Sequence, residues 1–411
     1  MIILNKEPDI KADMKSAIDR DESITIMEPL QISDSSSHRP ALIELALELA
    51  AKSAGFRRSL PAGVVMALAE LVRSMNCYYS NLIEGHDTHP VDIERAMRED
   101  YSNEPRKRDL QQEARAHVLV QTWIDNDGLA ERAATLEGIC EIHKRFGEML
   151  PDDLLWVEHP ESGESVQVIP GELRSRDVQV GHHIPISAGA VPRFLKRFEQ
   201  VYGRVQKAET ILSAAAAHHR LLWIHPFLDG NGRVARLMSY AMLRDTLNTG
   251  GIWSIARGLA RQEAAYKQFL VACDQPRQGD RDGRGSRSEK ALAEFTAFFL
   301  QTCIEQITFM EKLVQPDRLQ ARIRRWAEEE IRVGNLPPKA GNLLDAILYR
   351  GELPRSAVPS IVETGDRQAR RIASALQNLG VITSTSTRAP LRIAFPASLA
   401  GQWMPGLFPE A

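Results

Sequence analysis

The sequence predicts a mainly α-helical protein, and three observations carry this prediction. Apolar residues recur at helical spacing from Pro40 to about Leu313. The composition, 43% hydrophobic and 26% charged over 411 residues, is typical of a globular chain with two or three domains, and excludes collagen-like, coiled-coil and disordered proteins. No apolar run reaches the roughly 18 to 20 residues of a membrane helix. We therefore expect a helical core with small β elements and no membrane partner.

Charge and cysteine usage point to a cytoplasmic protein. The chain has 51 Lys and Arg against 54 Asp and Glu, a net charge of −3, so any site for a polyanion must be local. Charged residues in Met1 to Asp19 exclude a secretory signal. The cysteines form no C-x-x-C pair and are expected to be buried thiols: Cys77, Cys140, Cys273 and Cys303.

The first 39 residues form a segment whose role the sequence does not reveal. They contain one strand-like run, Ile24 to Met27, and a serine-rich linker at 33–37. The helical domain follows at 40–313, and one of its helices is predicted over about 64–85 because apolar residues repeat there at helical spacing.

Two stretches interrupt the helical pattern. In 166–186, turn residues Pro170, Gly171 and Gly181 bracket Val178-Gln179-Val180, which predicts a β-hairpin. In 276–290, glycines alternate with charges of both signs, which predicts a solvated loop.

The chain ends in a small module. A charged connecting helix at 314–336 leads to residues 337–411. There we predict helices over 343–348, 354–362 and 366–379, followed by strands over 381–385 and 391–394. Three helices and a hairpin in this order resemble a winged helix-turn-helix.

The strongest chemical signal is the segment His225-Pro-Phe-Leu-Asp-Gly-Asn-Gly-Arg-Val-Ala-Arg236, which lies between two apolar helices. Pro226 ends the first helix, so a tight loop must follow. Gly230, Asn231 and Gly232 bring backbone amides to the start of the second helix, where unpaired N–H groups and the helix dipole attract anions. The segment therefore predicts a phosphate site.

Side chains of this segment complete the site. Arg233 and Arg236, three residues apart on one helix, can hold adjacent phosphates. Asp229 is placed to bind a Mg²⁺ that the phosphates share. His225 can accept a proton from an incoming hydroxyl group. The calcium-loop alternative fails because Tyr240 stands where a bidentate Glu is needed, and no P-loop motif is present.

The motif H-P-F-x-D-G-N-G-R-x-x-R resembles the signature of the Fic family, whose members transfer nucleotide monophosphates to protein hydroxyl groups. The resemblance implies ATP as substrate, His225 as the base that deprotonates a target Tyr, Thr or Ser, Asp229 as the Mg²⁺ ligand, and release of pyrophosphate. It assigns the phosphates to Gly230, Asn231, Gly232, Arg233 and Arg236. Relatives that phosphorylate their target have Lys at the position of Gly232, which favours nucleotidyl transfer here.

Two further segments resemble parts of Fic proteins. Residues 170–181 resemble the Fic flap, a hairpin whose edge pairs with the target backbone through Val178, Gln179, Val180 and Gly181. The segment Ser80-Asn-Leu-Ile-Glu84-Gly85 resembles the inhibitory motif [ST]-x-x-x-E-[GN]. A pair between Glu84 and Arg236 would remove the cation that holds the γ phosphate, so the resemblance predicts an autoinhibited enzyme.

The remaining assignments are less specific. The helix with Tyr266 resembles the family segment near the nucleotide base, although Tyr266 also suits a core position. The same site can run in reverse, as a hydrolase that removes AMP. A DNA-binding regulator is the alternative function, since 339–398 holds eight Lys and Arg against four Asp and Glu, including Arg367, Arg370 and Arg371. The target protein, self-modification and a homodimer stay open.

Overall fold

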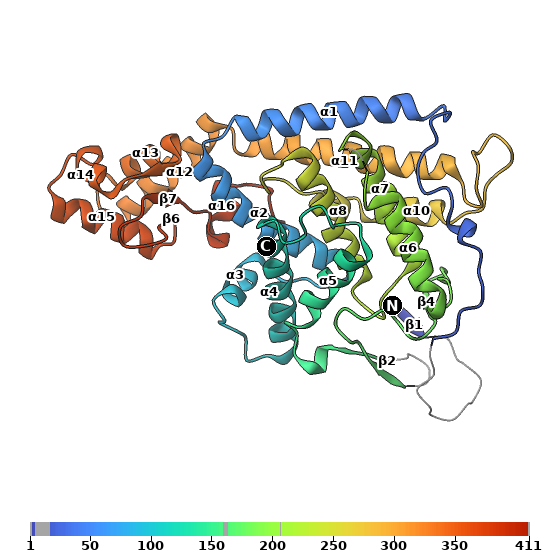
Figure 1. Cartoon of the computed structure of the whole chain (residues 1–411). Helices are drawn as coiled ribbons and strands as arrows, with labels where there is room; N and C mark the ends of the chain where they lie inside the picture. The colour runs from blue at the N-terminus through green and yellow to red at the C-terminus, as the bar shows by residue number, and fades with distance from the viewer. Residues whose placement is uncertain (1, 5–16, 159–162, 206, 410–411) are drawn as a thin grey trace.

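The computed structural model of the protein describes residues 2–4, 17–158, 163–205 and 207–409. Most of the regular structure in these ranges is helical, as predicted (Figure 1). The helices before the C-terminal module are α1 (Arg39–Arg58), α2 (Ala62–Ile83), α3 (Pro90–Met97), α4 (Pro105–Asp125), α5 (Leu136–Gly147), α6 (Val191–Tyr202), α7 (Lys207–Ile224), α8 (Asn231–Leu247), α9 (Ala256–Arg261), α10 (Glu263–Cys273), α11 (Glu289–Leu313) and α12 (Pro316–Arg332).

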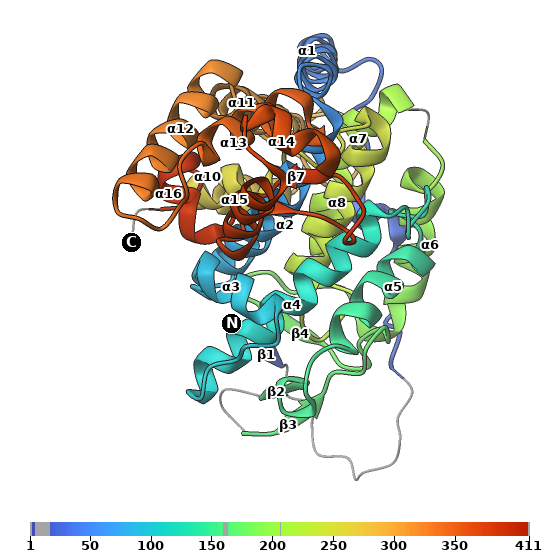
Figure 2. The ribbon, with the colours of Figure 1, turned by 90° about the vertical axis from the view of Figure 1, so that its left-hand side faces the viewer.

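The centre of the fold is the pair α7 and α8, which precede and follow the 225–230 loop. Helix α8 buries almost all of its first three turns, from Asn231 to Leu243. Helix α2 packs on α9 and α4, and the long helices α1 and α11 run side by side along one edge (Figure 1). Helix α4 contacts α2, α5 and α8, and α4 and α5 can be followed side by side in Figure 2. Arg236 of α8 hydrogen-bonds to Ser80 of α2. The end of α2 therefore lies beside the start of α8.

The β structure differs from the predicted hairpin over 166–186. Strand β2 (Trp156–Glu158) pairs with β3 (Ser165–Gln167), and β4 (Val178–Val180) pairs with β1 (Ile2–Leu4), in both cases antiparallel. The two ends of the predicted hairpin thus pair with other segments instead of each other. The segment between them is held by the buried side chain of Arg174, which hydrogen-bonds to backbone carbonyls. These contacts replace the ladder of a hairpin.

The run Ile24–Met27, predicted as a strand, is a 3-10 helix, η1. The hydroxyl of Ser23 accepts a hydrogen bond from the Thr25 N–H, a local contact that competes with extended structure. The Glu28 carbonyl that follows accepts from the N–H groups of Ser286 and Arg287. The 276–290 loop, predicted to be solvated, is therefore fixed to the N-terminal segment at one end.

The C-terminal module contains the predicted elements in the predicted order. Helices α13 (Ala340–Arg350), α14 (Val358–Ile361) and α15 (Asp366–Asn378) precede strands β6 (Ile382–Thr383) and β7 (Leu391–Ile393). A strand that the sequence did not suggest, β5 (Glu352–Leu353), pairs with β7 and completes a sheet of order β5-β7-β6. Helix α16 (Ala400–Trp403) follows. That this module works as a winged helix-turn-helix stays a prediction.

The module lies at one end of the molecule, but its last residues return to α2 (Figure 1). The Tyr79 hydroxyl donates a hydrogen bond to the Leu407 carbonyl at 2.9 Å. The rings of Tyr78 and Phe408 pack edge to face, with centroids 5.7 Å apart. The same hydrophobic cluster includes residues of the helical core and of the module. The chain end thus packs against α2 one turn before Glu84.

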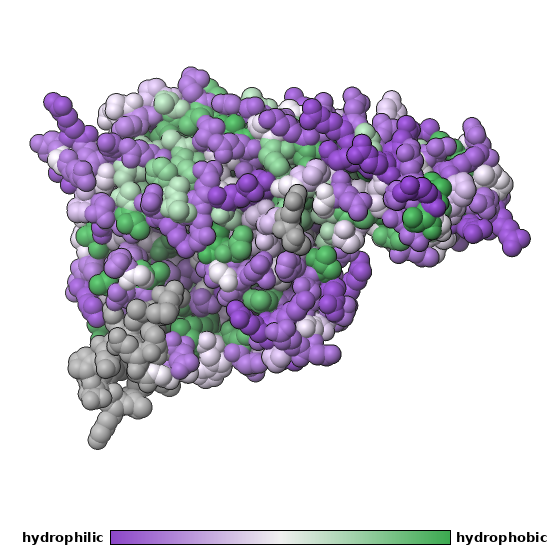
Figure 3. Space-filling view, turned by 180° about the vertical axis from the view of Figure 1, so that it is seen from behind, coloured by the Kyte–Doolittle hydropathy of each residue, from purple (hydrophilic) through white to green (hydrophobic). Residues whose placement is uncertain are grey.

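Two surface properties complete the description. Seen from behind, the surface is largely hydrophilic, with hydrophobic patches between polar regions (Figure 3). Within the described ranges, none of the helices has both the length and the apolar character needed to cross a bilayer.

Candidate functional site

His225 ends α7 in a conformation that is unusual for a non-glycine residue. Its φ is 53°, in the left-handed region, and its N–H still donates to the Leu221 carbonyl. The side chain is buried, and the ring Nε2 has no hydrogen-bond partner among the described residues. Burial, with the nearby cation of Arg174, lowers the pKa of His225 to about 3, so the imidazole is neutral at pH 7. A neutral ring with a free nitrogen is able to accept a proton.

The start of α8 has the backbone geometry that the predicted anion site requires. Gly230 precedes the helix with φ 78°, a conformation that glycine adopts without strain, and its carbonyl accepts the first intrahelical bond, from Val234 N–H. The N–H groups of the first helical residues have no intrahelical acceptor. The Asn231 side chain does not face outward, because it exchanges two hydrogen bonds with the backbone of Phe227, at 3.0 and 2.9 Å. It therefore shapes the loop, and only its backbone N–H is available to an anion.

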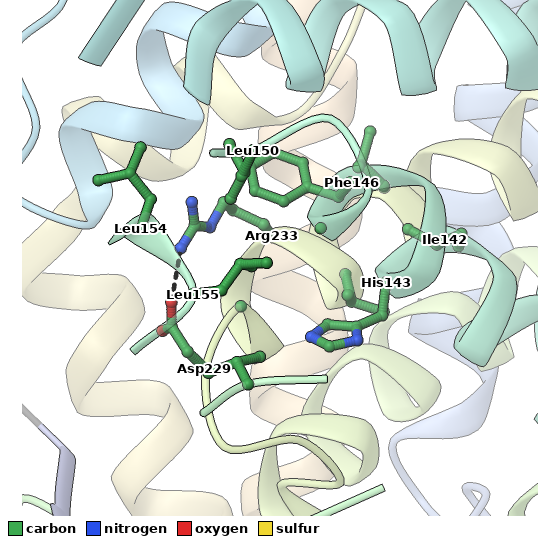
Figure 4. A pocket seen from close by; sticks show the side chains of 13 residues that line it. Ile142, His143, Phe146, Leu150, Leu154, Leu155, Asp229 and Arg233 are labelled. Carbon is green, nitrogen blue, oxygen red and sulfur yellow. Dashed lines mark hydrogen bonds and ion pairs between the residues drawn. The ribbon is translucent and has the colours of Figure 1, made fainter. Parts of the chain in front are cut away.

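Arg233 lies at the edge of a pocket between α5 and the loop (Figure 4). Its Nη2 donates to Asp229 Oδ2 at 3.0 Å, and its guanidinium carbon lies 4.7 Å from the centre of the Phe146 ring. Glu113 adds a second carboxylate at 3.6 Å from Nη1. Both Nε and Nη1 of Arg233 are buried and lack a hydrogen-bond partner in the described part of the chain. These two nitrogens thus have hydrogen-bonding capacity that none of the described residues uses.

The guanidinium group of Arg236 already has hydrogen-bond partners, Ser80 and Glu84, at the end of α2. Its Nη2 donates to Glu84 Oε1, its Nε donates to Ser80 Oγ at 2.9 Å, and Nη2 also reaches the Ser80 carbonyl at 3.3 Å. Burial would raise the pKa of Glu84, but the charge and hydrogen bond of Arg236, together with the charges of Arg233 and His86, lower that pKa, so the carboxylate is ionised. The structure therefore brings Arg236 together with Ser80 and Glu84, which lie 156 and 152 residues earlier in the chain. Gly85 ends this turn with φ 84°.

Gly232 gives Glu84 the space it occupies. A Cβ atom at position 232 would lie 2.3 Å from Glu84 Oε1 and 3.0 Å from Arg236 Nη1. Real Cβ contacts do not reach the shorter distance, so a side chain at 232 and the Glu84–Arg236 pair exclude each other in this arrangement. The absence of a side chain at this position serves the pair as well as the approach of an anion.

Tyr266 and the predicted flap residues contact other parts of the protein. Tyr266 is buried, and its hydroxyl bonds to His218 Nε2 at 2.6 Å, so its ring is a core element in this conformation. In the flap segment, Val178 is buried with Val168 and Leu228, and the backbone of 178–180 pairs with residues 2–4. Gly181 follows with φ 59°.

Sequence reasoning missed two residues that support the loop. His143 stacks on Phe227, with ring centroids 3.9 Å apart, and its Nδ1 accepts from Gly171 N–H at 2.9 Å. Burial lowers the pKa of His143 to about 4, so this ring is neutral too. Arg174 donates to the His225 carbonyl at 2.7 Å. Arg174 stands inside the flap motif, but nothing in the motif indicates that it contacts the loop.

The described residues contain no group of three or more His, Cys, Asp and Glu side chains that could hold a metal ion by themselves. The side chain of Asp229 is 47% exposed at the mouth of the loop. Mg²⁺ keeps most of its water ligands and commonly takes one or two protein carboxylates together with substrate phosphates. A single exposed carboxylate beside an anion site fits such a shared ion.

Comparison with known proteins agrees with the motif. Residues 133–243 match the Fic/DOC family. The chain is 32% identical over 128 residues to "Protein adenylyltransferase Fic" of Drosophila mojavensis, which is 30% of this chain and 22% of that protein. The protein of the same name from Drosophila grimshawi is 31% identical over 128 residues, 30% of this chain and 23% of that protein. The chain thus spans less than a quarter of the length of these curated relatives.

A solved structure extends the likeness beyond the motif. The crystal structure of a Fic family protein from Desulfovibrio desulfuricans G20 superposes with a TM-score of 0.51 at 14% identity, and covers 89% of this chain and 98% of that one. At this identity the likeness concerns the fold alone. The chain thus contains a Fic/DOC family domain at residues 133–243.

Proposed function

We propose that this protein is an autoinhibited adenylyltransferase that transfers AMP from ATP to a hydroxyl group of a target protein or of itself. The observation that carries the proposal is the pairing of Arg236 with Glu84 beside a free His225 Nε2. His225 has a nitrogen free to accept a proton, while Arg236, one of the two proposed phosphate-binding arginines, is bound to the carboxylate of Glu84. The names of the curated relatives support the reaction class.

In the proposed reaction, the amides at the start of α8 and Arg233 hold the phosphates. His225 Nε2 takes the proton of a Tyr, Thr or Ser hydroxyl as the hydroxyl oxygen bonds to the α phosphorus. The bond from the α phosphorus to the bridging oxygen breaks, and pyrophosphate leaves with the electron pair. Asp229 would hold Mg²⁺, which supplies positive charge to the phosphates when bound.

Glu84 acts as the brake in this scheme. With Glu84 in place, Arg236 is not free to hold the γ phosphate, so ATP binds without the orientation that aligns the α phosphorus with the attacking hydroxyl. The target backbone would approach the edge of β4, which in this structure carries an antiparallel strand from residues 2–4. That pairing supports an edge that accepts extended chain.

The test uses ATP labelled separately at the α and γ phosphates, with Mg²⁺ and the full-length protein. Glu84→Ala should incorporate α label into itself well above the wild-type rate, and Glu84→Ala/His225→Ala should lose that incorporation. Glu70→Ala is the matched control, because Glu70 is an exposed glutamate on the same helix. Label from the γ position, or no label with any variant, would contradict the proposal.

Removal of AMP by the same site is tested on the product. AMP-modified protein, prepared with Glu84→Ala, is incubated with unlabelled wild type. Release of AMP by wild type but not by Glu84→Ala would assign hydrolysis to the Glu84 form of the site.

A second candidate function rests on α15. Arg367, Arg370 and Arg371 are exposed, and no ion pair involves them within the described ranges. Three free cations on one helix suit phosphate contacts with duplex DNA. Binding to a duplex should weaken as salt rises and weaken further with Arg370→Ala/Arg371→Ala; no binding at low salt would remove this function.

A further inference from the structure

Arg174 is among the largest fully buried side chains of the protein, and its side chain has no exposed surface. It follows the turn at Gly171, in the segment between β3 and β4. Its Nε donates to the His225 carbonyl at 2.7 Å, its Nη1 donates to the Arg176 carbonyl at 2.9 Å, and its Nη2 donates to the Ile186 carbonyl. Its backbone N–H donates to the Pro226 carbonyl at 2.8 Å.

This arrangement is specific to arginine. The planar guanidinium offers five N–H donors in a fixed fork, and here three carbonyls from three different places in the chain meet that fork. The nearest carboxylate, that of Asp177, is 3.7 Å from Nη1. Burial lowers the pKa of Arg174 to about 10, which still leaves the group charged at neutral pH. A residue that served only to fill space would not need a buried charge.

Arg174 binds two consecutive carbonyls of the loop: its side chain donates to the His225 carbonyl, and its backbone N–H donates to the Pro226 carbonyl. His225 has a φ of 53°, a conformation that non-glycine residues keep only where the surroundings enforce it. The direction of the imidazole depends on this backbone, because the side chain leaves from the same Cα. The ring Nε2 is buried and has no hydrogen-bond partner among the described residues.

We propose that Arg174 is a positioning residue for His225: by holding the His225 carbonyl it maintains the left-handed backbone that aims Nε2 at the incoming hydroxyl. This inference rests on the proposed transfer reaction. Arg174 also connects the flap segment to the loop, since the Ile186 carbonyl binds to the same guanidinium. The segment that would receive the target and the base that would activate it are thus fixed to each other by one side chain.

The experiment measures initial rates of self-modification against ATP concentration in the Glu84→Ala background. Arg174→Lys keeps the charge but loses the fork, and Arg174→Met loses both. We expect kcat to fall on the order of 10²-fold in each, the effect of misplacing a reacting group by about 1 Å. The apparent KM for ATP should stay within about twofold, because the α8 amides and Arg233 are untouched.

Arg220→Lys is the matched control for burial. Arg220 is also fully buried and donates to backbone carbonyls, to Pro29 at 2.8 Å and to Cys273 at 3.5 Å, but it does not contact the 225–230 loop. Its replacement should lower the melting temperature as much as Arg174→Lys does, with a much smaller loss of kcat. If Arg174→Met does not fold, the comparison of the two lysine variants decides.

The pH profile of kcat/KM separates positioning from general damage. The Arg174 charge opposes protonation of His225, so the acidic limb should move to higher pH in Arg174→Met and keep its place in Arg174→Lys. Equal kcat losses in Arg174→Lys and Arg220→Lys, or an acidic limb that does not move in Arg174→Met, would overturn the proposal. Absence of transfer by Glu84→Ala itself would instead contradict the proposed function.

Discussion

Arg233 and Arg236 stand one turn apart on α8, yet their partners differ in origin. Arg236 binds Glu84, which comes from α2, 152 residues earlier in the chain. Arg233 binds Asp229, four residues away in the same loop, and keeps two buried nitrogen atoms without partners. In the proposed reaction, the first carboxylate blocks a cation that the substrate needs, and the second holds its cation at the place where the substrate arrives. Two similar ion pairs on one helix thus support opposite roles.

Removing the Asp229 carboxylate tests most directly whether the two ion pairs have opposite roles. Asp229→Asn in the Glu84→Ala background should lower kcat/KM for ATP on the order of 10²-fold, because the proposed ligand for Mg²⁺ is lost at the charge-stabilising site. Glu84→Ala alone should change the rate in the opposite direction. Rates of α-label incorporation measure both, and an equal rise in the two variants would mean that the carboxylates have the same role.

A double-mutant cycle sharpens the comparison on the Arg236 side. The Cβ of Gly232→Ala would meet Glu84 Oε1 at 2.3 Å, so this variant should displace Glu84 and lower the free energy of unfolding. In the Glu84→Ala background the same change should cost less, and a coupling of about 0.5 kcal/mol or more would show it. Urea denaturation measures it. Independent, additive effects would show that Gly232 and Glu84 do not share space.

The base beside these arginines should titrate at low pH. The pKa of His225 is lowered to about 3, so the unprotonated form persists well below the usual pKa of histidine, and kcat/KM should hold its plateau below pH 6.5. The measurement is the kcat/KM profile of Glu84→Ala at saturating Mg²⁺. An acidic limb centred at or above pH 6.5 would be inconsistent with a buried, neutral imidazole in the free enzyme.

The smallest expected effect concerns Glu113, which lies behind Arg233 and pairs with His86 at 2.9 Å. The hydrogen bond to Glu113 raises the pKa of His86, so the pair contributes stability that is present below pH 6.5 and lost as pH rises through the raised pKa. The melting temperature of Glu113→Gln should therefore fall further below that of wild type at pH 6 than at pH 9. A difference that is larger at pH 9 would contradict the assignment.

The sequence predicted the parts of the site that depend on local pattern. The helices on both sides of the loop, the glycines at the start of α8 and the position of His225 follow from residue spacing and from Pro226. The expected pair of Glu84 and Arg236 came from a resemblance, and the two side chains do contact each other. That this contact inhibits the protein stays a prediction.

What the sequence could not predict are contacts made by tertiary packing. The roles of Arg174, His143 and Glu113 depend on which carbonyls and rings happen to lie beside them, and no periodicity encodes that. The predicted hairpin was wrong for the same reason, because β4 pairs with residues 2–4, which are distant in sequence, rather than with an adjacent segment. The 3-10 helix at 24–27 shows a local serine contact prevailing over β propensity.

The contacts of Leu407 and Phe408 with α2 predict how truncating mutations would act. A stop codon just before Leu407 would remove the acceptor of the buried Tyr79 hydroxyl and the neighbour of the Tyr78 ring. An unpaired buried hydroxyl is costly, and this one would arise next to Ser80, whose oxygen atoms hold Arg236. Nonsense and frameshift alleles that remove Leu407 and the residues after it would therefore disturb the Fic/DOC domain, although Leu407 lies more than 160 residues beyond its matched region at 133–243.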